Sequence, residues 1–403
     1  MKVYIGSCGM GLGHVTRCSV IAGEFSRRGM DVYFSSYSDG FDYLKRTGFR
    51  CFAAVPVSFR TREDGTIDLK LTMTQNGVTM SLWKFLKQIV GELVQIGSYG
   101  PDVVVSDTRI STLIAGFLFR KPTLLILNQY SVQMPNYDRP VKLWDRFMLF
   151  SAQIAWKYAS KVLELLWGLG NVIVVPDLKP PFTISRYNLT IPVGFKRKVK
   201  MIGPLSPGEK TRSIAGLPNG IHSVTREFRP LVFACVSGPN SDRKHLVNIL
   251  SGILREVPDE WNLVLSSGDP KGSTVARQVG RLTYYEWMEH DAYEEHFDKA
   301  AVIVSRAGHG TIMRAVTKAK PMVLIPPPNH TEQANNARRA EEIGLAIVLD
   351  QVRLNGDVLT RAVKDSLANN ASSAETVRDL AGRDGGVEAI VEIVRELAES
   401  PRF

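Results

Sequence analysis

The sequence predicts an α/β protein whose two doubly wound domains face one another across a cleft. At 403 residues the chain is too long for one ordinary hydrophobic core, and two domains of roughly 200 residues each are the natural expectation. Strand and helix patterns alternate in both halves, as expected for parallel sheets covered by helices. An irregular, proline-interrupted stretch lies between the halves, where a linker would run.

The first half supplies the elements of the first domain. Its opening strand enters a glycine-rich loop, and a helical pattern then runs until Gly29 ends it. Two later strands are apolar until they end at Asp107 and Asn128, so we expect these polar side chains to face the cleft. In chain order, the expected strands are 3–5, 31–35, 102–107, 122–128 and 172–175, the last closing the domain, and the first helix is 14–28.

The second half restarts the same alternation after the irregular stretch 186–229, which carries a basic run around Lys198. Strands are expected at 231–236 and 261–268 with a helix between them, and a final helix at 385–398 follows a Gly-Gly turn. The expected organisation is a first domain at 1–200, a linker at 201–229, a second domain at 230–384 and a C-terminal segment at 385–403.

Two loops of the second half carry the most informative pattern. Each follows an apolar run and opens a helix, so the loops at 305–311 and 326–333 should lie side by side at the carboxyl ends of neighbouring parallel strands. Gly308 and Gly310 let backbone N–H groups approach an anion, and the helix that begins near Thr311 offers its positive dipole end to the same group. We therefore expect a phosphate to bind here.

Composition limits the classes of function. An apolar share of 44% is typical of a soluble globular protein, and no run reaches the roughly 18 uncharged apolar residues of a membrane span, so we expect a cytoplasmic protein. The net charge of +10 indicates an anionic partner. No nucleic-acid-binding signature accompanies the charge, so a membrane surface or a diphosphate is the better candidate. The cysteines have no CxxC spacing, which argues against a zinc site and a disulfide framework.

The first glycine-rich loop holds the candidate base. Gly9, Gly11 and Gly13 lack the G-x-G-x-x-G spacing, and the second strand ends in serines rather than an acidic residue, which disfavours a dinucleotide cofactor. The loop instead lets an acceptor diphosphate or sugar approach the backbone closely. His14 lies where the loop becomes a helix, and an imidazole is suited to take a proton from a sugar hydroxyl near neutral pH. The alternative is a residue that only shapes the loop.

Asp107 is the candidate partner of His14. A carboxylate at this strand end is expected near the glycine loop, where it could orient the imidazole as carboxylates orient bases in other enzymes. A carboxylate after a strand is also a common helix cap. Both roles stay open at this point.

Three motifs together resemble the GT-B glycosyltransferases: Gly-Met-Gly-Leu-Gly-His at 9–14, Ser-Arg-Ala-Gly at 305–308, and the stretch 330–337 with its Glu-Gln and Asn-Ala pairs. The likeness is closest to enzymes that move N-acetylglucosamine (GlcNAc) from UDP to polyprenyl-diphosphate-linked sugars, in peptidoglycan synthesis and in eukaryotic and archaeal N-glycosylation. The resemblance implies two Rossmann-like domains and a C-terminal helix that crosses back onto the first. It also implies an inverting transferase that uses a UDP-sugar, needs no metal ion or other cofactor, and works peripherally at the inner face of the cell membrane.

The resemblance places the sugar donor on the second domain. The turn at Ser237 resembles the family's phosphate-binding turn, with a plain strand-to-helix turn as the alternative, and Arg306 either supplies charge or anchors its own loop. Glu332 and Gln333 match the pair that binds the transferred sugar, although the helix dipole alone also favours an acidic first turn. The implied sugar-donor-binding residues are Ser237, Gly238, Arg306, Gly308, His309, Gly310, Thr311, Glu332 and Gln333. The implied acceptor-binding residues are Gly11, Gly13 and Asn128.

One position departs from the family pattern. Many relatives place a glutamate six residues after the glycine that matches Gly308, where it binds both ribose hydroxyls, but this chain has Arg314. An arginine side chain donates hydrogen bonds and cannot accept them, so recognition of the ribose must differ. The identity of the nucleotide is therefore less well defined than the fold.

Two segments of the first half combine aromatic, apolar and basic residues at helical spacing. Residues 80–90 include Trp83 and Phe85 beside lysines, and residues 141–150 include Trp144 and Phe147 beside Arg146 and Lys142. Such helices can lie in a membrane interface, with aromatic rings at headgroup level and cations near anionic lipid. Helices that only face a core have the same pattern. The lipid-linked acceptors of the resembling family favour membrane contact.

Other functions fit the same fold. A diacylglycerol glycosyltransferase shares the membrane requirement but needs no cationic partners for a diphosphate near the first glycine loop, and a nucleotide-sugar 2-epimerase needs no acceptor. A noncatalytic module that binds nucleotide sugars, or the scaffold half of a split transferase, is a further alternative. The presence of His14 together with Glu332 and Gln333 favours an active enzyme.

Overall fold

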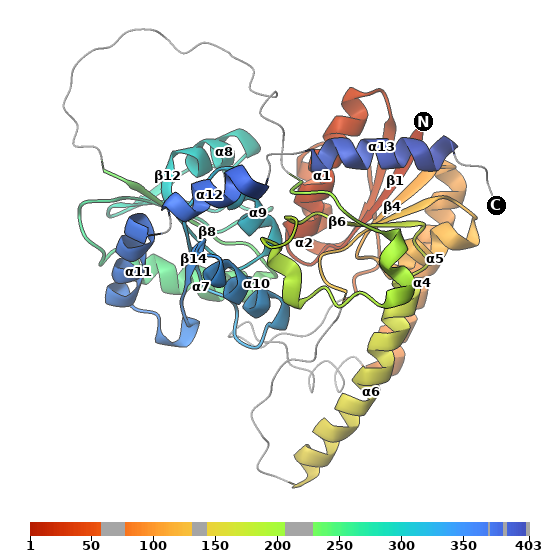
Figure 1. Cartoon of the computed structure of the whole chain (residues 1–403), viewed down its shortest axis with the longest axis horizontal. Helices are drawn as coiled ribbons and strands as arrows, with labels where there is room; N and C mark the ends of the chain where they lie inside the picture. Colours follow the sequence, from red (N-terminus) through yellow and green to blue (C-terminus); the bar gives the residue numbers. More distant parts are fainter. Residues whose placement is uncertain (58–76, 131–142, 206–228, 370, 382–384, 400–403) are drawn as a thin grey trace.

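The structure, a computed structural model, describes residues 1–57, 77–130, 143–205, 229–369, 371–381 and 385–399. Within these ranges the chain forms two seven-stranded sheets, and helices pack on both faces of each sheet. The two sheets belong to two domains that lie side by side (Figure 1). The predicted fold class, two doubly wound α/β domains, is confirmed.

The first sheet has the strand order β3-β2-β1-β4-β5-β6-β7, and its described strands are parallel. The strands are β1 Lys2–Ser7, β2 Asp31–Ser36, β3 Cys51–Ala53, β4 Val103–Asp107, β5 Thr123–Ile126, β6 Val172–Val175 and β7 Val199–Met201. The helices are α1 Gly13–Arg27, α2 Ser38–Arg46, α4 Gly77–Tyr99, α5 Ile110–Leu118 and α6 Leu143–Trp167, with 3-10 turns η1 Ile184–Tyr187 and η2 Val193–Lys198.

The second sheet has the order β10-β11-β9-β8-β12-β13-β14, and only the β10–β11 pair is antiparallel among its described strands. The strands are β8 Leu231–Cys235, β9 Asn262–Ser266, β10 Arg277–Val279, β11 Leu282–Tyr285, β12 Ala300–Ser305, β13 Met322–Leu324 and β14 Ala346–Val348. The helices are α7 Asn240–Ile253, α8 His290–Lys299, α9 His309–Thr317, α10 Thr331–Glu342, α11 Gly356–Asn369, α12 Ala371–Ala381 and α13 Gly386–Glu399, with a 3-10 turn η4 Gln351–Arg353.

The strand order of each sheet reverses at one point, and these two points define the cleft. In the first sheet the reversal lies between β1 and β4, and in the second it lies between β8 and β12. Open α/β sheets bind ligands outside the carboxyl ends of the strands at such a reversal. The first glycine loop follows β1, Asp107 is the last residue of β4, and the loops after β8 and β12 contain Ser237 and Gly308. As predicted, β12 and β13 are parallel neighbours, so the two informative loops of the second half extend from the same edge.

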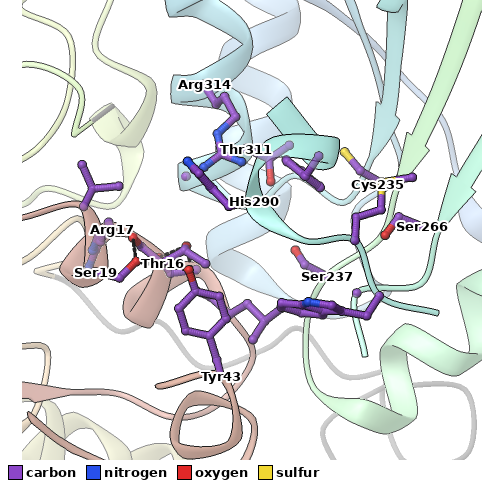
Figure 2. A pocket seen from close by; sticks show the side chains of 18 of the residues that line it. Thr16, Arg17, Ser19, Tyr43, Cys235, Ser237, Ser266, His290, Thr311 and Arg314 are labelled. Carbon is purple, nitrogen blue, oxygen red and sulfur yellow. Dashed lines mark hydrogen bonds between the residues drawn. The ribbon is translucent and has the colours of Figure 1, made fainter. Parts of the chain in front are cut away.

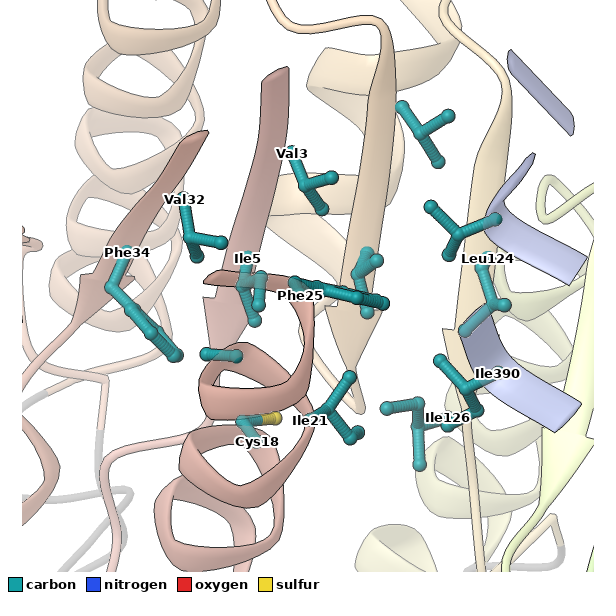
Figure 3. Packing of buried hydrophobic residues seen from close by; sticks show 14 of the residues in the cluster. Val3, Ile5, Cys18, Ile21, Phe25, Val32, Phe34, Leu124, Ile126 and Ile390 are labelled. Atoms are coloured by element: carbon teal, nitrogen blue, oxygen red, sulfur yellow. The ribbon is translucent and has the colours of Figure 1, made fainter. Parts of the chain in front are cut away.

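Helix α13 crosses back onto the first domain, as the fold class predicts. Its apolar positions Ile390, Val391 and Val394 are fully buried and recur every three or four residues, so they form one face. Figure 3 shows Ile390 beside Leu124 and Ile126 of the first sheet, in the same core as residues of β1, β2 and α1. Burial of this face attaches the C-terminal end of the chain to the first domain (Figure 1).

The structure differs from expectation after β6. Residues 172–175 do not close the domain, because β7 adds a seventh strand beyond them, and the basic run around Lys198 lies in η2 and β7 rather than in a linker. Between β6 and β7 the chain crosses to the second domain, where Leu178 and Ile184 are buried in that domain's core. A short polar stretch with prolines does not predict such an excursion, because only its few apolar residues indicate burial in the other domain.

Candidate active site

A pocket lies between the domains, beside the two reversal points. Its lining comes from α1 and α2 of the first domain and from the loops after β8, β9, β11 and β12 of the second. Figure 2 shows Thr16, Arg17, Ser19 and Tyr43 on one side and residues that include Ser237, Thr311 and Arg314 on the other. Of the residues predicted to contact substrate, the lining includes Gly13, Ser237, Gly310 and Thr311.

Two glycines bring the loops of the two domains into contact. Gly11 has φ +70° and Gly238 has φ +131°, backbone conformations that favour glycine. A Cβ atom on Gly11 would lie only 3.1 Å from the Cα of Gly238. A side chain at Gly11 would therefore press on the loop at Gly238, so this glycine allows the close approach of the two domains.

His14 and Asp107 meet beside this pocket: neither is a lining residue, but Gly13 and Arg17, one residue before His14 and three after it, both line the pocket. His14 is the second residue of α1, and Asp107 ends β4 with no solvent exposure. The Nδ1 atom of His14 lies 2.8 Å from Oδ1 of Asp107. Thr108 follows with φ +57°, a conformation that a non-glycine residue adopts at a cost and that is common at functional sites. The predicted pair is thus assembled, and its catalytic role remains a prediction.

Arg17 completes this cluster, and the sequence reasoning missed it. Its Nε atom donates to Oδ2 of Asp107 at 2.6 Å, and its Nη2 atom donates to Oδ1 at 2.5 Å. Burial by itself raises the pKa of the Asp107 carboxyl, but the cation of Arg17 and the contact with His14 outweigh burial and hold this pKa well below its usual range. The sequence contains one indication of this cluster: Arg17 follows His14 by three residues, and residues three apart on a helix lie on the same face.

Asn128 connects the cluster to the second domain. Its Oδ1 atom accepts from Nη1 of Arg17 at 3.2 Å, and its Nδ2 atom donates to Oε1 of Glu332 at 2.8 Å. In the structure both ends of the Asn128 amide take part in a bridge between the domains, and its contact with the acceptor stays a prediction. Glu332 is in the first turn of α10, so the bridge leads from the candidate base to the candidate sugar-binding pair.

The second-domain side of the cleft is built from helix N-termini. Gly308 is the N-cap of α9, whose first turn is open to the pocket at Gly310 and Thr311, and a helix N-terminus presents backbone N–H groups to an anion. The N–H of Thr311 donates to the carbonyl of Gly308, so Gly310 is the better candidate for this contact. Gln333 is in the first turn of α10, and its Oε1 atom is buried without a hydrogen-bond partner among the described residues. A buried polar atom without a partner is costly and is consistent with a site that awaits a ligand.

Two residues predicted to bind the sugar donor have other partners. Arg306 is 1% exposed and bonds Asp242 and the carbonyl of Ile325, so its guanidinium anchors its own loop. The ring of His309 is buried with Nε2 3.1 Å from Oδ2 of Asp177, which belongs to the chain excursion after β6. Neither residue lines the pocket.

Arg314, the departure from the family pattern, lines the pocket from α9. Its guanidinium lies 5.1 Å from the centre of the Tyr293 ring and 3.4 Å from Oε1 of Glu294. These contacts hold the guanidinium of Arg314 in place. The pocket wall also carries aromatic side chains, and the rings of Trp287 and Tyr43 lie 5.9 Å apart. Burial raises the pKa of the Cys235 thiol, which also lines the pocket, to about 11, so this cysteine is protonated at neutral pH.

The first domain has exposed apolar side chains on two helices. Trp83 is 55% exposed on α4, and Lys87 lies over its ring at 5.3 Å, whereas Phe85 is partly buried. Trp144 and Phe147 fall in α6, but their side chains lie outside the described part of the chain. The exposed large apolar residues are Met80, Leu82, Trp83, Leu86, Val90 and Val94 on α4, and Phe150, Ile154, Tyr158, Val162 and Leu165 on α6. Helix α6 projects from the body of the domain (Figure 1).

No described helix is both long and apolar enough to span a bilayer. Nor do three or more His, Cys, Asp or Glu side chains gather there as ligands of a metal ion would.

Comparison with known proteins places both halves of the chain. Residues 241–387 match the glycosyltransferase family 28 C-terminal domain, and residues 1–159 match glycosyl transferase family 1. An uncharacterized glycosyltransferase of Methanosarcina acetivorans is 25% identical over 98% of each chain. The UDP-N-acetylglucosamine–N-acetylmuramyl-(pentapeptide) pyrophosphoryl-undecaprenol N-acetylglucosamine transferase of Streptococcus mutans is 25% identical over 51% of this chain and 55% of its own.

Solved structures agree in fold. The calicheamicin glycosyltransferase CalG4 superposes with a TM-score of 0.63 at 17% identity over 99% of both chains. MurG of Acinetobacter baumannii superposes with a TM-score of 0.56 at 15% identity over 98% of this chain and 99% of its own. The matched domains, the relatives and the shared architecture together identify this chain as a glycosyltransferase with the GT-B fold.

Proposed function

We propose that this glycosyltransferase is an inverting, metal-independent enzyme that moves GlcNAc from UDP-GlcNAc to a saccharide linked to polyprenyl or dolichyl diphosphate. The observation that carries the proposal is the contact between His14 and Asp107, 2.8 Å long, at the edge of a pocket that the N-terminus of α9 enters from the other domain. A candidate base and a candidate anion site thus face the same cleft, as transfer between two bound substrates requires.

The second domain holds the sugar donor in this proposal. Backbone N–H groups at the start of α9 and the turn at Ser237 bind the diphosphate, and the helix dipole stabilises the charge that develops as UDP leaves. Glu332 and the unpartnered Gln333 Oε1 bind hydroxyls of the transferred sugar. The choice of UDP-GlcNAc and of a lipid-linked acceptor is supported by the family resemblance and by the name of the Streptococcus mutans relative.

The first domain performs the proton transfer. Nε2 of His14 takes the proton from the acceptor hydroxyl while the hydroxyl oxygen attacks the anomeric carbon from the face opposite UDP. The new glycosidic bond forms as the bond to the UDP oxygen breaks, so the configuration inverts. The buried carboxylate of Asp107 stabilises the imidazolium that results. Contact of the two domains around the pocket excludes water, which would otherwise hydrolyse the sugar donor.

We further propose that the first domain docks peripherally on the cytoplasmic face of the cell membrane through α4 and α6. The exposed apolar side chains of these helices lie next to Lys84 and Lys87 on α4 and Lys157 and Lys161 on α6. Apolar burial combined with attraction of lysines to anionic lipid suits interfacial binding. This placement would bring a lipid-linked acceptor to the domain that carries His14.

A screen of nucleotide sugars tests the catalytic proposal. We expect UDP-GlcNAc to raise the melting temperature most, and transfer to a GlcNAc-diphosphate-polyprenyl acceptor to persist in EDTA, because backbone groups and a helix dipole hold the diphosphate. Transfer to diacylglycerol in place of the diphosphate lipid would instead identify a glycolipid synthase. Release of a 2-epimer from UDP-GlcNAc alone would identify an epimerase. Absence of stabilisation by every nucleotide sugar would contradict the proposal.

Sedimentation with liposomes tests the membrane proposal. Replacement of Leu82, Trp83 and Leu86 by Ser should release the protein from vesicles that contain anionic lipid, and high salt should weaken wild-type binding only partly, since apolar burial persists when charges are screened. Val275→Ser with Val352→Ser is the matched control, because both valines are exposed on the second domain. A wild-type protein that never sediments with such vesicles would contradict the membrane proposal.

A further inference from the structure

The Nδ1 atom of His14 has three polar neighbours, and they determine which ring nitrogen carries the proton. Oδ1 of Asp107 lies at 2.8 Å, Nη2 of Arg17 at 3.0 Å and Oγ1 of Thr108 at 3.4 Å. A neutral imidazole has one N–H. If Nδ1 accepted a hydrogen bond from Arg17, the proton would sit on Nε2, and Nε2 could not act as a base. If Nδ1 donates to Asp107, Nε2 is free to accept a proton.

The hydrogen atoms of Arg17 decide between these two forms. The Nη2 group has two hydrogens, and it has two oxygen acceptors: Oδ1 of Asp107 at 2.5 Å and Oδ1 of Asn128 at 3.3 Å. The Nε hydrogen is directed at Oδ2 of Asp107, and Nη1 donates to Asn128 as well. The hydroxyl of Thr108 donates to the carbonyl of Asp107 at 2.8 Å. Each of these donors therefore has an oxygen acceptor, so Arg17 is satisfied without donating to Nδ1 of His14 across their 3.0 Å contact. Without a proton on Nδ1, in contrast, the lone pair of Nδ1 would face a carboxylate oxygen of Asp107 at 2.8 Å.

We propose that Arg17 is a positioning residue that fixes His14 in the tautomer with the proton on Nδ1, leaving Nε2 unprotonated. Its two-pronged contact orients the Asp107 carboxylate so that Oδ1 faces Nδ1, and its remaining hydrogens are held by Asn128. Only the planar fork of a guanidinium supplies this combination; the ammonium of a lysine is a point charge. The consequence for catalysis rests on the proposed function of His14 as the base.

The same residue also orients the bridge to the second domain. Because Arg17 donates to Oδ1 of Asn128, the amide must turn its Nδ2 atom the other way, and this atom donates to Oε1 of Glu332. Arg17 therefore positions the candidate base and the candidate sugar-binding carboxylate at once. Its side chain is 8% exposed, so these contacts are shielded from water and strongly directional.

Nuclear magnetic resonance of the histidine ring nitrogens in the full-length protein tests the tautomer without substrate. His14→Gln assigns the signal by its loss. In the wild type, at a pH where the ring is neutral, we expect Nδ1 to carry the proton and Nε2 to show the shift of an unprotonated nitrogen. In Arg17→Lys the carboxylate loses its two-pronged partner, so we expect a mixture of both tautomers.

Asn128→Leu provides a second variant that keeps Arg17. It frees one Nη2 hydrogen that can then be directed at Nδ1 of His14, so the tautomer protonated on Nε2 should appear although the contact between Arg17 and Asp107 persists. The matched control is Arg109→Lys, since Arg109 is another buried arginine of the same domain, paired with Glu92 at 2.6 Å. This control should leave the spectrum of His14 unchanged.

Kinetics supply the second readout. For Arg17→Lys, we expect kcat to fall about 10- to 100-fold while KM for the sugar donor rises only a few-fold, because the protonation of the base is affected directly and Glu332 of the other domain is affected only through Asn128. A wild-type His14 protonated on Nε2, or an Arg17→Lys variant with an unchanged ring spectrum, would overturn the inference. A wild type with the expected tautomer that transfers no sugar would overturn the proposed function and leave the role of Arg17 standing.

Discussion

The two sides of the cleft are built in different ways. On the first-domain side, the partly exposed His14 joins the buried Arg17 and Asp107 in a cluster whose side chains hydrogen-bond one another before any substrate arrives. On the second-domain side, the pocket meets the backbone at the start of α9, and the buried Oε1 atom of Gln333 has no hydrogen-bond partner within the described chain. Under the proposed function, the first domain is arranged for proton transfer, and the second domain is arranged to bind the nucleotide sugar.

The division has a physical reason. A base needs a fixed tautomer and orientation, which a closed network of charged side chains provides. A binding site for a nucleotide sugar needs open donors and acceptors, since each is to be satisfied by the ligand. Mutations on the two sides should therefore act on different kinetic constants, and each prediction below tests this separation.

The largest effect is expected from His14→Ala. Loss of the general base should lower kcat about 100-fold or more, while the affinity for UDP-GlcNAc, measured by calorimetry, stays nearly unchanged. Asp107→Asn should lower kcat less, because it removes the orienting charge and keeps the imidazole. His245→Ala, on α7 of the other domain, is the matched control. A fall in affinity for the sugar donor as large as the fall in kcat would assign His14 a structural role and contradict the separation of roles between the two domains.

Gln333→Ala should have an intermediate effect on the opposite side. If the unpartnered Oε1 atom binds a sugar hydroxyl, the variant should bind UDP-GlcNAc about tenfold more weakly and discriminate less between sugars, while free UDP binds as before. Gln278→Ala is the control, because the side chain of Gln278 exchanges hydrogen bonds with Thr283 on the exposed strand pair β10–β11 of the same domain. Equal loss of UDP affinity would show that Gln333 supports the nucleotide and not the sugar.

The sequence revealed features that are local and missed those that are not. The glycine loop before His14 and the polar ends at Asp107 and Asn128 follow from strand and turn patterns within a few residues, and the structure brings these side chains to one place. The partner of Arg17 lies 90 residues away, so no local pattern announces it. The three-residue spacing between His14 and Arg17 places both on one helix face, but it does not indicate that Arg17 contacts Asp107.

The same limit explains the interdomain contacts. Asp177 follows β6 and approaches His309 in the other domain, a pairing that depends on how two sheets dock. The motif at His309 suggested a ligand contact because the sequence shows its loop and not the excursion that covers its ring. The packing of Leu178 and Ile184 into the second core was missed for the same reason, since two apolar residues in a polar stretch have no periodicity.

The smallest effect is expected at the seam formed by α2, which contacts the second domain through ion pairs near the surface. Asp42 pairs with Lys271 at 3.1 Å, and Arg46 pairs with Glu289 at 3.0 Å, from positions four residues apart on one helix face. Exposed pairs of this kind are weak and screened by salt.

If these ion pairs help to hold the domains together around the pocket, Lys271→Met should lower transfer about twofold at low salt and reduce its salt dependence. Lys299→Met is the control, because that lysine pairs with Glu295 within α8 and does not cross the seam. Transfer by Lys271→Met that matches the wild type at every salt concentration would show that this ion pair does not help to hold the two domains around the pocket.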